Sequence, residues 1–142
     1  VSFGGGNFTS AELQAFKRLG LDSNRFCQMS GSDETLSQLY FGANAFVYPS
    51  FYEGFGLPPL EAMGHQCPVV SSNTSSMPEV IGDAAEYFNP KSENDMAQAI
   101  ERVVYSPSRI NKLVTNGLKR QAAFTWDRCA IQTLEVYKQM VG

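Results

Sequence analysis

Cysteine and histidine are scarce in this sequence, with three cysteines and one histidine among 142 residues. Cys27, Cys67 and Cys129 lie far apart, show no CxxC spacing, and leave at least one thiol unpaired in a monomer. The pattern argues against a disulfide framework, and a chain of this length can bury a core without such staples. We therefore expect a single domain from a reducing compartment, the cytoplasm.

Long apolar runs are also missing. No stretch approaches the roughly 18 uninterrupted apolar residues that a membrane-spanning helix requires, and no basic segment followed by an apolar run opens the chain. Hydrophobic residues make up 43% of the sequence and charged residues 18%, a balance typical of a globular domain. The sequence thus predicts a soluble, folded chain without a transmembrane segment.

Positive charge is not concentrated enough for a nucleic-acid platform. The net charge is −3, from 11 basic and 14 acidic side chains. Residues 51–100 hold seven acidic side chains against Lys91 alone, whereas residues 101–142 carry seven basic against three acidic ones. Domains that bind nucleic acid usually show clustered basic residues and a high pI, so no nucleic-acid partner is expected.

Short β-prone stretches alternate with helical ones along most of the chain. Strands are expected at residues 1–3, 26–29, 45–48, 68–71 and 86–88, with helices after Thr9, from Asp33, from near Pro59 and, as a single turn, at 78–82. Such alternation indicates parallel βαβ units in an open, doubly wound α/β sheet. From Glu93 onward the pattern is helical, predicting two or three helices that cover the sheet, the last anchored by Trp126.

The most informative segment is residues 50–63, SFYEGFGLPPLEAM, which leaves a predicted strand and enters a predicted helix. Ligands of open α/β sheets bind at the carboxyl ends of the strands, where this segment should lie. Gly54 and Gly56 let the backbone approach a ligand closely, and a helix that begins near Pro59 directs its positive end at the same spot. This arrangement suits a phosphate or a diphosphate.

Two carboxylates flank the predicted anion site, Glu53 before the glycines and Glu61 in the expected first helical turn, with seven residues between them. Because carboxylates repel phosphate, their natural targets are hydroxyl groups, and a sugar nucleotide offers both polyols and a diphosphate. An alternative remains open at this point. Glu61 could merely complement the helix dipole, and the glycines could merely form a tight connection.

Residues 50–63, together with Pro68-Val69-Val70, Pro78-Glu79-Val80 and Gly82-Asp83-Ala84, resemble the C-terminal domain of the retaining GT-B glycosyltransferases of family four, the "group 1" class. The resemblance continues to Phe124-Thr125-Trp126. It implies a Rossmann-like α/β fold, the partial C-terminal half of a GT-B fold, with residues 1–142 forming one truncated sugar-nucleotide-binding domain.

The resemblance also implies roles for single residues. Glu53 would be the catalytic residue that contacts and orients the donor sugar, without acting as a covalent nucleophile, and Glu61 would bind the ribose hydroxyls. The donor sugar and its diphosphate would be held by the backbone amides of Gly54, Phe55, Gly56 and Leu57. Gly31 lies in the region where the family contacts the base, although Met29 stands where a glycine is common.

The implied reaction is transfer of a hexosyl group from a nucleotide-diphospho-sugar to an acceptor hydroxyl with retention. No metal or other cofactor is expected, because GT-B enzymes generally work without a divalent metal and the sequence has no Asp-x-Asp pair. The acceptor, a glycan or a lipid, would bind a missing N-terminal domain, and a lipid acceptor would place the complete enzyme at the inner membrane face. Because the family's basic diphosphate-binding segment is also missing, the isolated chain is not expected to turn over.

Two rival interpretations remain. A non-catalytic sugar-nucleotide-binding or interaction module could keep the same fold, and a sugar phosphorylase or epimerase could share the architecture, although no lysine in a matching context is available for the pyridoxal phosphate of the phosphorylases. One departure from the family pattern is Gln66, where a glycine is common, and it puts the local turn geometry in question. His65 is interpreted as a polar residue at a helix end rather than as a base.

Overall fold

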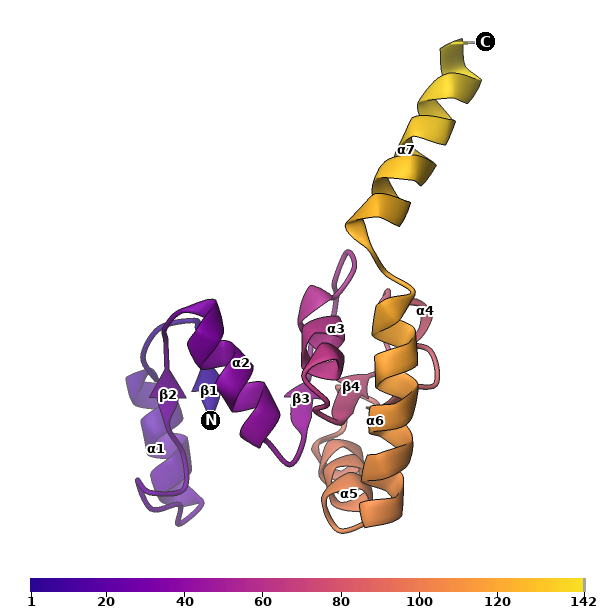
Figure 1. Ribbon diagram of the computed structural model, residues 1–142. Helices are drawn as coiled ribbons and strands as arrows, with labels where there is room; N and C mark the ends of the chain where they lie inside the picture. Colours follow the sequence, from indigo (N-terminus) through magenta and orange to yellow (C-terminus); the bar gives the residue numbers. More distant parts are fainter. Residues whose placement is uncertain (142) are drawn as a thin grey trace. The chain divides into compact units, whose positions relative to one another are not determined.

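The computed structural model describes residues 1–141, which fall into two compact units. The first unit comprises Val1–Leu39, and the second runs from Tyr40 to the end of the chain. Each unit has its own parallel sheet, as Figure 1 shows. Helix α2 (Asp33–Gly42) contains the boundary between them.

The first unit pairs strand β1 (Ser2–Phe3) with strand β2 (Gln28–Met29), with Ser2 opposite Gln28. Helix α1 (Ser10–Arg18) lies between them in the sequence. Three aromatic rings, those of Phe8, Phe16 and Phe26, pack together with centroids 4.3–5.7 Å apart. These rings give the unit an apolar cluster.

Helix α1 begins where it was expected, after Thr9, and it begins with a complete capping box. The Thr9 hydroxyl accepts a hydrogen bond from the Glu12 backbone N–H, and a Glu12 carboxylate oxygen accepts one from the Thr9 backbone N–H at 2.6 Å. The reciprocal pair satisfies two backbone donors that a helix start leaves without partners. The hydrogen bonds from Thr9 hold the pKa of Glu12 below its ordinary value.

The second unit holds a three-stranded sheet in the order β3 (Phe46–Tyr48), β4 (Val69–Ser72), β5 (Ala85–Phe88). Both pairings are parallel, and Val47 lies opposite Val70, which lies opposite Glu86. The predicted α/β class with parallel strands flanked by helices is confirmed. The five strands nevertheless form two sheets, where the sequence analysis predicted a single open one.

One part of the core of the second unit lies between its sheet and two helices, α5 (Glu93–Val104) and α6 (Pro107–Ala122). Ser92 and Ser106 cap these helices by accepting hydrogen bonds from backbone N–H groups three residues later. The buried cluster consists of Val70, Phe88, Ala99, Val103 and Leu113. Packing against this cluster fixes β4 and β5, and thereby the loops that follow these strands.

Helices α3 (Leu57–Gly64) and α6 lie side by side, as Figure 1 shows. Their close approach depends on Gly117, which is buried in α6. A Cβ atom at this position would lie 2.9 Å from Cγ and 3.2 Å from Cβ of Met63 on α3. The missing side chain of Gly117 therefore lets α6 support the helix that leaves the motif loop.

The C-terminal helix α7 (Trp126–Val141) does not cover the sheet, which corrects part of the sequence analysis. Its residues 126–140 are all exposed. Trp126, predicted to anchor this helix by packing, is 81% exposed. The apolar positions of the segment predict its helicity correctly, but a helical period does not reveal which surface, if any, will bury it.

Strand β5 is tied to α5 and α6 by an ion-pair cluster around Glu86. Arg102 Nε lies 2.6 Å from one carboxylate oxygen of Glu86, and Arg109 Nη2 lies 2.7 Å from the other. Burial opposes ionisation of Glu86, but the hydrogen bonds and charges of the two arginines outweigh it and lower the pKa of the carboxyl. The cluster joins three elements of the second unit.

Replacing Glu86 with glutamine is expected to destabilise the protein by about 1 kcal/mol at pH 7, a typical value for charged pairs near a surface. The folded-state pKa of Glu86 is lowered, so its stabilising effect is present above the unfolded-state pKa and is lost as the pH falls through the folded-state value. Chemical denaturation of both proteins from pH 7 to pH 3 tests this. A difference in stability that did not shrink on acidification would contradict it.

Candidate functional site

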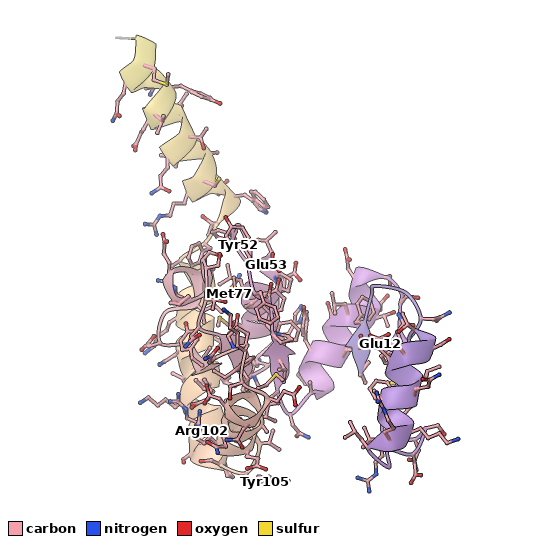
Figure 2. The ribbon with its side chains drawn as sticks, turned by 180° about the vertical axis from the view of Figure 1, so that it is seen from behind. Glu12, Tyr52, Glu53, Met77, Arg102 and Tyr105 are labelled. Atoms are coloured by element: carbon pink, nitrogen blue, oxygen red, sulfur yellow. The ribbon has the colours of Figure 1, made fainter. Side chains whose placement is uncertain are left out.

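The motif loop connects the end of β3 to α3, so it leaves the carboxyl end of a parallel strand as predicted. Figure 2 shows Tyr52 and Glu53 at this loop, with Arg102 and Tyr105 at the opposite end of the same unit. Tyr52 and Phe55 are exposed, whereas Glu53 is partly buried. Gly54 is exposed as well, whereas Gly56 is buried.

Helix α3 begins at Leu57, two residues earlier than predicted. Gly56 precedes it with φ 102°, a left-handed conformation that favours glycine, and thereby turns the chain into the helix. Pro58 and Pro59 occupy the first turn, where their missing N–H groups cost no hydrogen bond. As a result, Glu61 lies in the second turn, so its predicted place in the first turn is wrong, and the alternative that it merely complements the helix dipole loses its basis.

The Glu53 carboxylate is held by two hydroxyl groups from its own neighbourhood. Tyr48 donates a hydrogen bond of 2.7 Å to Oε1, and Ser50 donates one of 2.9 Å to the same oxygen. These two bonds stabilise the ionised form and hold the pKa of Glu53 below its ordinary value, against a smaller effect of burial. Glu53 is therefore a fixed, charged acceptor.

The backbone of Glu53 is held by the serine-rich loop that follows β4. Ser75 Oγ accepts from the Glu53 N–H at 3.3 Å and donates to its carbonyl at 2.8 Å. Ser76 Oγ bonds the carbonyls of Glu53 and Phe55 at 2.9 and 3.0 Å. Ser75 itself has φ 55°, uncommon for a residue with a side chain. The two loops thus form one hydrogen-bonded assembly at adjacent strand ends.

Glu61 is exposed on α3, and its carboxylate influences Tyr40 of α2. Burial, followed by the nearby Glu61 charge, raises the pKa of Tyr40 to about 12. The Tyr40 ring is 5% exposed, packs edge-on against Phe46 at 5.2 Å and stacks with His65 at 5.9 Å. Glu61 therefore has an exposed carboxylate and lies near the buried ring of Tyr40.

An open groove of about 1200 Å³ borders the motif and is lined, among others, by Gly54, Phe55, Leu57 and Glu61. Arg120 also lines it, but its guanidinium donates to the backbone carbonyls of Glu79 and Val80 and lies 5.0 Å from the Phe124 ring. That cation is already engaged in holding α4 (Met77–Ile81). The groove is also lined by Glu79 and, on α7, by Trp126 and Arg128, whereas Glu53 does not line it.

Gly31 belongs to the first unit, where it is exposed and directly precedes α2. A Cβ atom there would lie 2.9 Å from Thr35 Oγ1. This close approach gives Gly31 a local packing reason for its missing side chain. Its assignment as a base-binding residue stays a prediction.

Sequence reasoning did not find Tyr48, Ser50, Ser75 or Ser76. The first two are neighbours of Glu53 in the sequence, and strand periodicity could have placed Tyr48 at the site because it ends β3. The Ser75 and Ser76 contacts span 21–23 residues. They depend on the pairing of β3 with β4, and no local signal reveals them.

A parallel α/β unit with a glycine loop and a fixed carboxylate at its strand ends has the architecture of the open α/β folds, whose ligands bind at the carboxyl ends of the strands. The chain belongs to the family of glycosyl transferases group 1, whose pattern it matches over residues 3–120. Its fold is that of the GT-B glycosyltransferases, as the resemblance implied.

Curated relatives include an O-antigen chain mannosyltransferase B of Escherichia coli, 44% identical over 106 residues, covering 75% of this chain and 28% of that protein. An MMP alpha-(1->4)-mannosyltransferase of Mycolicibacterium hassiacum is 35% identical over 115 residues, covering 78% of this chain and 28% of that protein. The chain thus spans little more than a quarter of the length of these two relatives.

Among solved structures, the sucrose-phosphate synthase of Thermosynechococcus elongatus superimposes with a TM-score of 0.80 at 28% identity, covering 98% of this chain and 37% of the other. A GtfA/B complex superimposes with a TM-score of 0.74 at 20% identity over 96% of this chain and 28% of the other, which supports the fold alone.

Residues 1–141 contain no helix with the length and apolar character needed to cross a membrane. The same residues contain no cluster of three or more His, Cys, Asp or Glu side chains placed to hold a metal ion.

Proposed function

We propose that residues 1–142 form the donor-binding domain of a retaining hexosyltransferase that takes its sugar from a nucleotide-diphospho-sugar. The observation that carries the proposal is the assembly around Glu53, a carboxylate fixed by two hydroxyls directly before a glycine loop that leads into a helix. The carboxylate suits sugar hydroxyls, and the amides of Gly54, Phe55, Gly56 and Leu57 suit a diphosphate.

In this proposal Glu53 orients the donor sugar, and Glu61, exposed on α3, binds the ribose hydroxyls. The domain then acts by positioning the donor and by stabilising the departing diphosphate, without a metal or other cofactor. The acceptor, a glycan or a lipid, binds elsewhere in the complete enzyme, which we place in the cytoplasm. We propose mannose as the sugar because the two relatives reported above are named mannosyltransferases.

Replacing Glu61 with alanine is expected to weaken nucleotide binding about tenfold, because the ribose loses its charged acceptor. Ligand-observed NMR with UDP, GDP, ADP and their mannose and glucose conjugates measures the affinities. Glu93→Gln, an exposed change in the first turn of α5, serves as a control with an altered charge elsewhere. Equal affinities of wild-type and Glu61→Ala proteins would contradict the ribose role.

The second candidate function, a non-catalytic sugar-nucleotide-binding module, makes a different prediction for the complete polypeptide encoded by the gene. The enzyme releases nucleoside diphosphate in the presence of donor and an oligosaccharide or lipid-linked acceptor, whereas the module binds donor without release. If the complete polypeptide bound none of the nucleotides, both functions would be wrong.

A further inference from the structure

Tyr48 is the last residue of β3, and its hydroxyl and that of Ser50 converge on a single oxygen of Glu53, Oε1. In residues 1–141 the structure gives no hydrogen bond to Oε2. An ionised carboxylate can accept about four hydrogen bonds. Two donors on Oε1 thus fix the group while Oε2 remains available to a ligand.

The phenol of Tyr48 is itself held in place. Its ring stacks on Phe46 with centroids 5.7 Å apart, and Phe46 packs edge-on against the buried ring of Tyr40. Burial and the hydrogen bond to Glu53 raise the pKa of Tyr48 to about 12, so the hydroxyl stays protonated at physiological pH. The proton that it donates to Glu53 is therefore present under working conditions.

We propose that Tyr48, assisted by Ser50, is the positioning residue of Glu53: the two hydroxyls hold Oε1 so that Oε2 is presented to a hydroxyl of the donor sugar. Tyr48 itself touches no substrate in this arrangement. The inference deepens the proposed function and rests on the role of Glu53 in it. Ser75 and Ser76 complement the two hydroxyls, because they fix the Glu53 backbone and not its carboxylate.

The variant Tyr48→Phe removes one donor to Glu53 and keeps the ring that packs on Phe46. The chain offers a matched control, Tyr87→Phe in β5, whose hydroxyl donates a hydrogen bond of the same length, 2.7 Å, to the Gly82 carbonyl. Burial also raises the pKa of Tyr87 to about 12. The control therefore reports the general cost of losing a partly buried phenol hydroxyl in this unit.

The direct measurement is the pH titration of the Glu53 carboxyl carbon by NMR, assigned with the Glu53→Gln variant. Tyr48→Phe should raise the pKa of Glu53 toward its ordinary value, and Tyr87→Phe should leave it unchanged. In the complete polypeptide, Tyr48→Phe should lower kcat/KM about tenfold and move the acidic limb of its pH profile upward. Tyr87→Phe should leave this limb in place.

An unchanged Glu53 pKa in Tyr48→Phe would overturn the proposal, however well the protein bound donor. Should Tyr48→Phe fail to fold, Ser50→Ala removes the other donor to Oε1, and an unchanged pKa there would overturn it equally. If the wild-type protein bound no nucleotide-sugar but the pKa of Glu53 rose in Tyr48→Phe alone, the proposed function would fail while the positioning of the carboxylate held.

Discussion

Replacing Glu53 with glutamine is expected to lower the rate of sugar transfer about 100-fold, the order of effect that follows from losing the orientation of a bound reactant. Glutamine has nearly the same shape, and its amide oxygen can still accept from the two donors now on Oε1. It carries no charge, so it binds sugar hydroxyls less strongly. Steady-state kinetics of the complete polypeptide, with a panel of nucleotide-diphospho-sugars, gives the ratio of kcat/KM values.

Glu53→Gln should lower the rate of sugar transfer and leave nucleotide binding nearly unchanged, because we expect Glu61 and the loop amides to hold the nucleotide. Affinity for the nucleoside diphosphate alone should therefore change by less than about threefold. Glu101→Gln, an exposed change on α5, is the control for loss of one negative charge. A Glu53→Gln enzyme that kept more than about half of its activity would remove this carboxylate from the mechanism.

The elements of the fold could be predicted from short-range patterns. Serine before Glu93 and before Pro107, and proline at the first turn of α3, are local signals, and the helices that they predict are present. The parallel strands follow from the alternation of strand and helix. Each of these inferences depends on residues within a few positions of one another, which a single sequence shows directly.

Gln66 shows how a departure from the family pattern finds a physical explanation only in the structure. A glycine is common at this position in the family pattern, and Gln66 adopts φ 61°, the left-handed conformation that glycine favours. The chain thus keeps the turn after α3 at some conformational cost, at a distance of thirteen residues from Glu53 in the sequence. Gln66 therefore gives the turn the backbone conformation that a glycine would adopt there.

The parts of the site that could not be predicted depend on contacts between distant segments. Ser75 and Ser76 reach Glu53 only because β4 lies beside β3, and the early start of α3 depends on the left-handed Gly56. Trp126 was predicted to be packed, but it is exposed. The sequence around an aromatic residue at a helix start does not show whether another segment covers it. Local chemistry therefore identified the loop, and tertiary contacts determine its shape.

Gly56 connects the motif loop to the core. It turns the chain into α3, and it lies against Met77 of α4. A Cβ atom at position 56 would lie 2.4 Å from Met77 Cε and 3.2 Å from its Sδ. Met77 is 1% exposed, so the end of its side chain would have to shift within the core to make room. The position therefore opposes any side chain for two separate reasons, the positive φ and the lack of space.

Gly56→Ala is expected to destabilise the protein by about 2–5 kcal/mol, because a left-handed residue costs about 1–2 kcal/mol and overpacking about 1–3 kcal/mol. Denaturant unfolding measures this loss, and NMR titration with the nucleotide panel should show weaker donor binding as the loop amides shift. Gly54→Ala is the stability control, because its Cβ would meet nothing within 4 Å. Gly56→Ala combined with Met77→Ala should relieve the clash but not the strain at φ, so donor affinity should stay reduced in the double variant. If both alanine variants were equally stable, the loop would not depend on the conformation of Gly56, and its amides could not be the preformed diphosphate site that the proposed function requires.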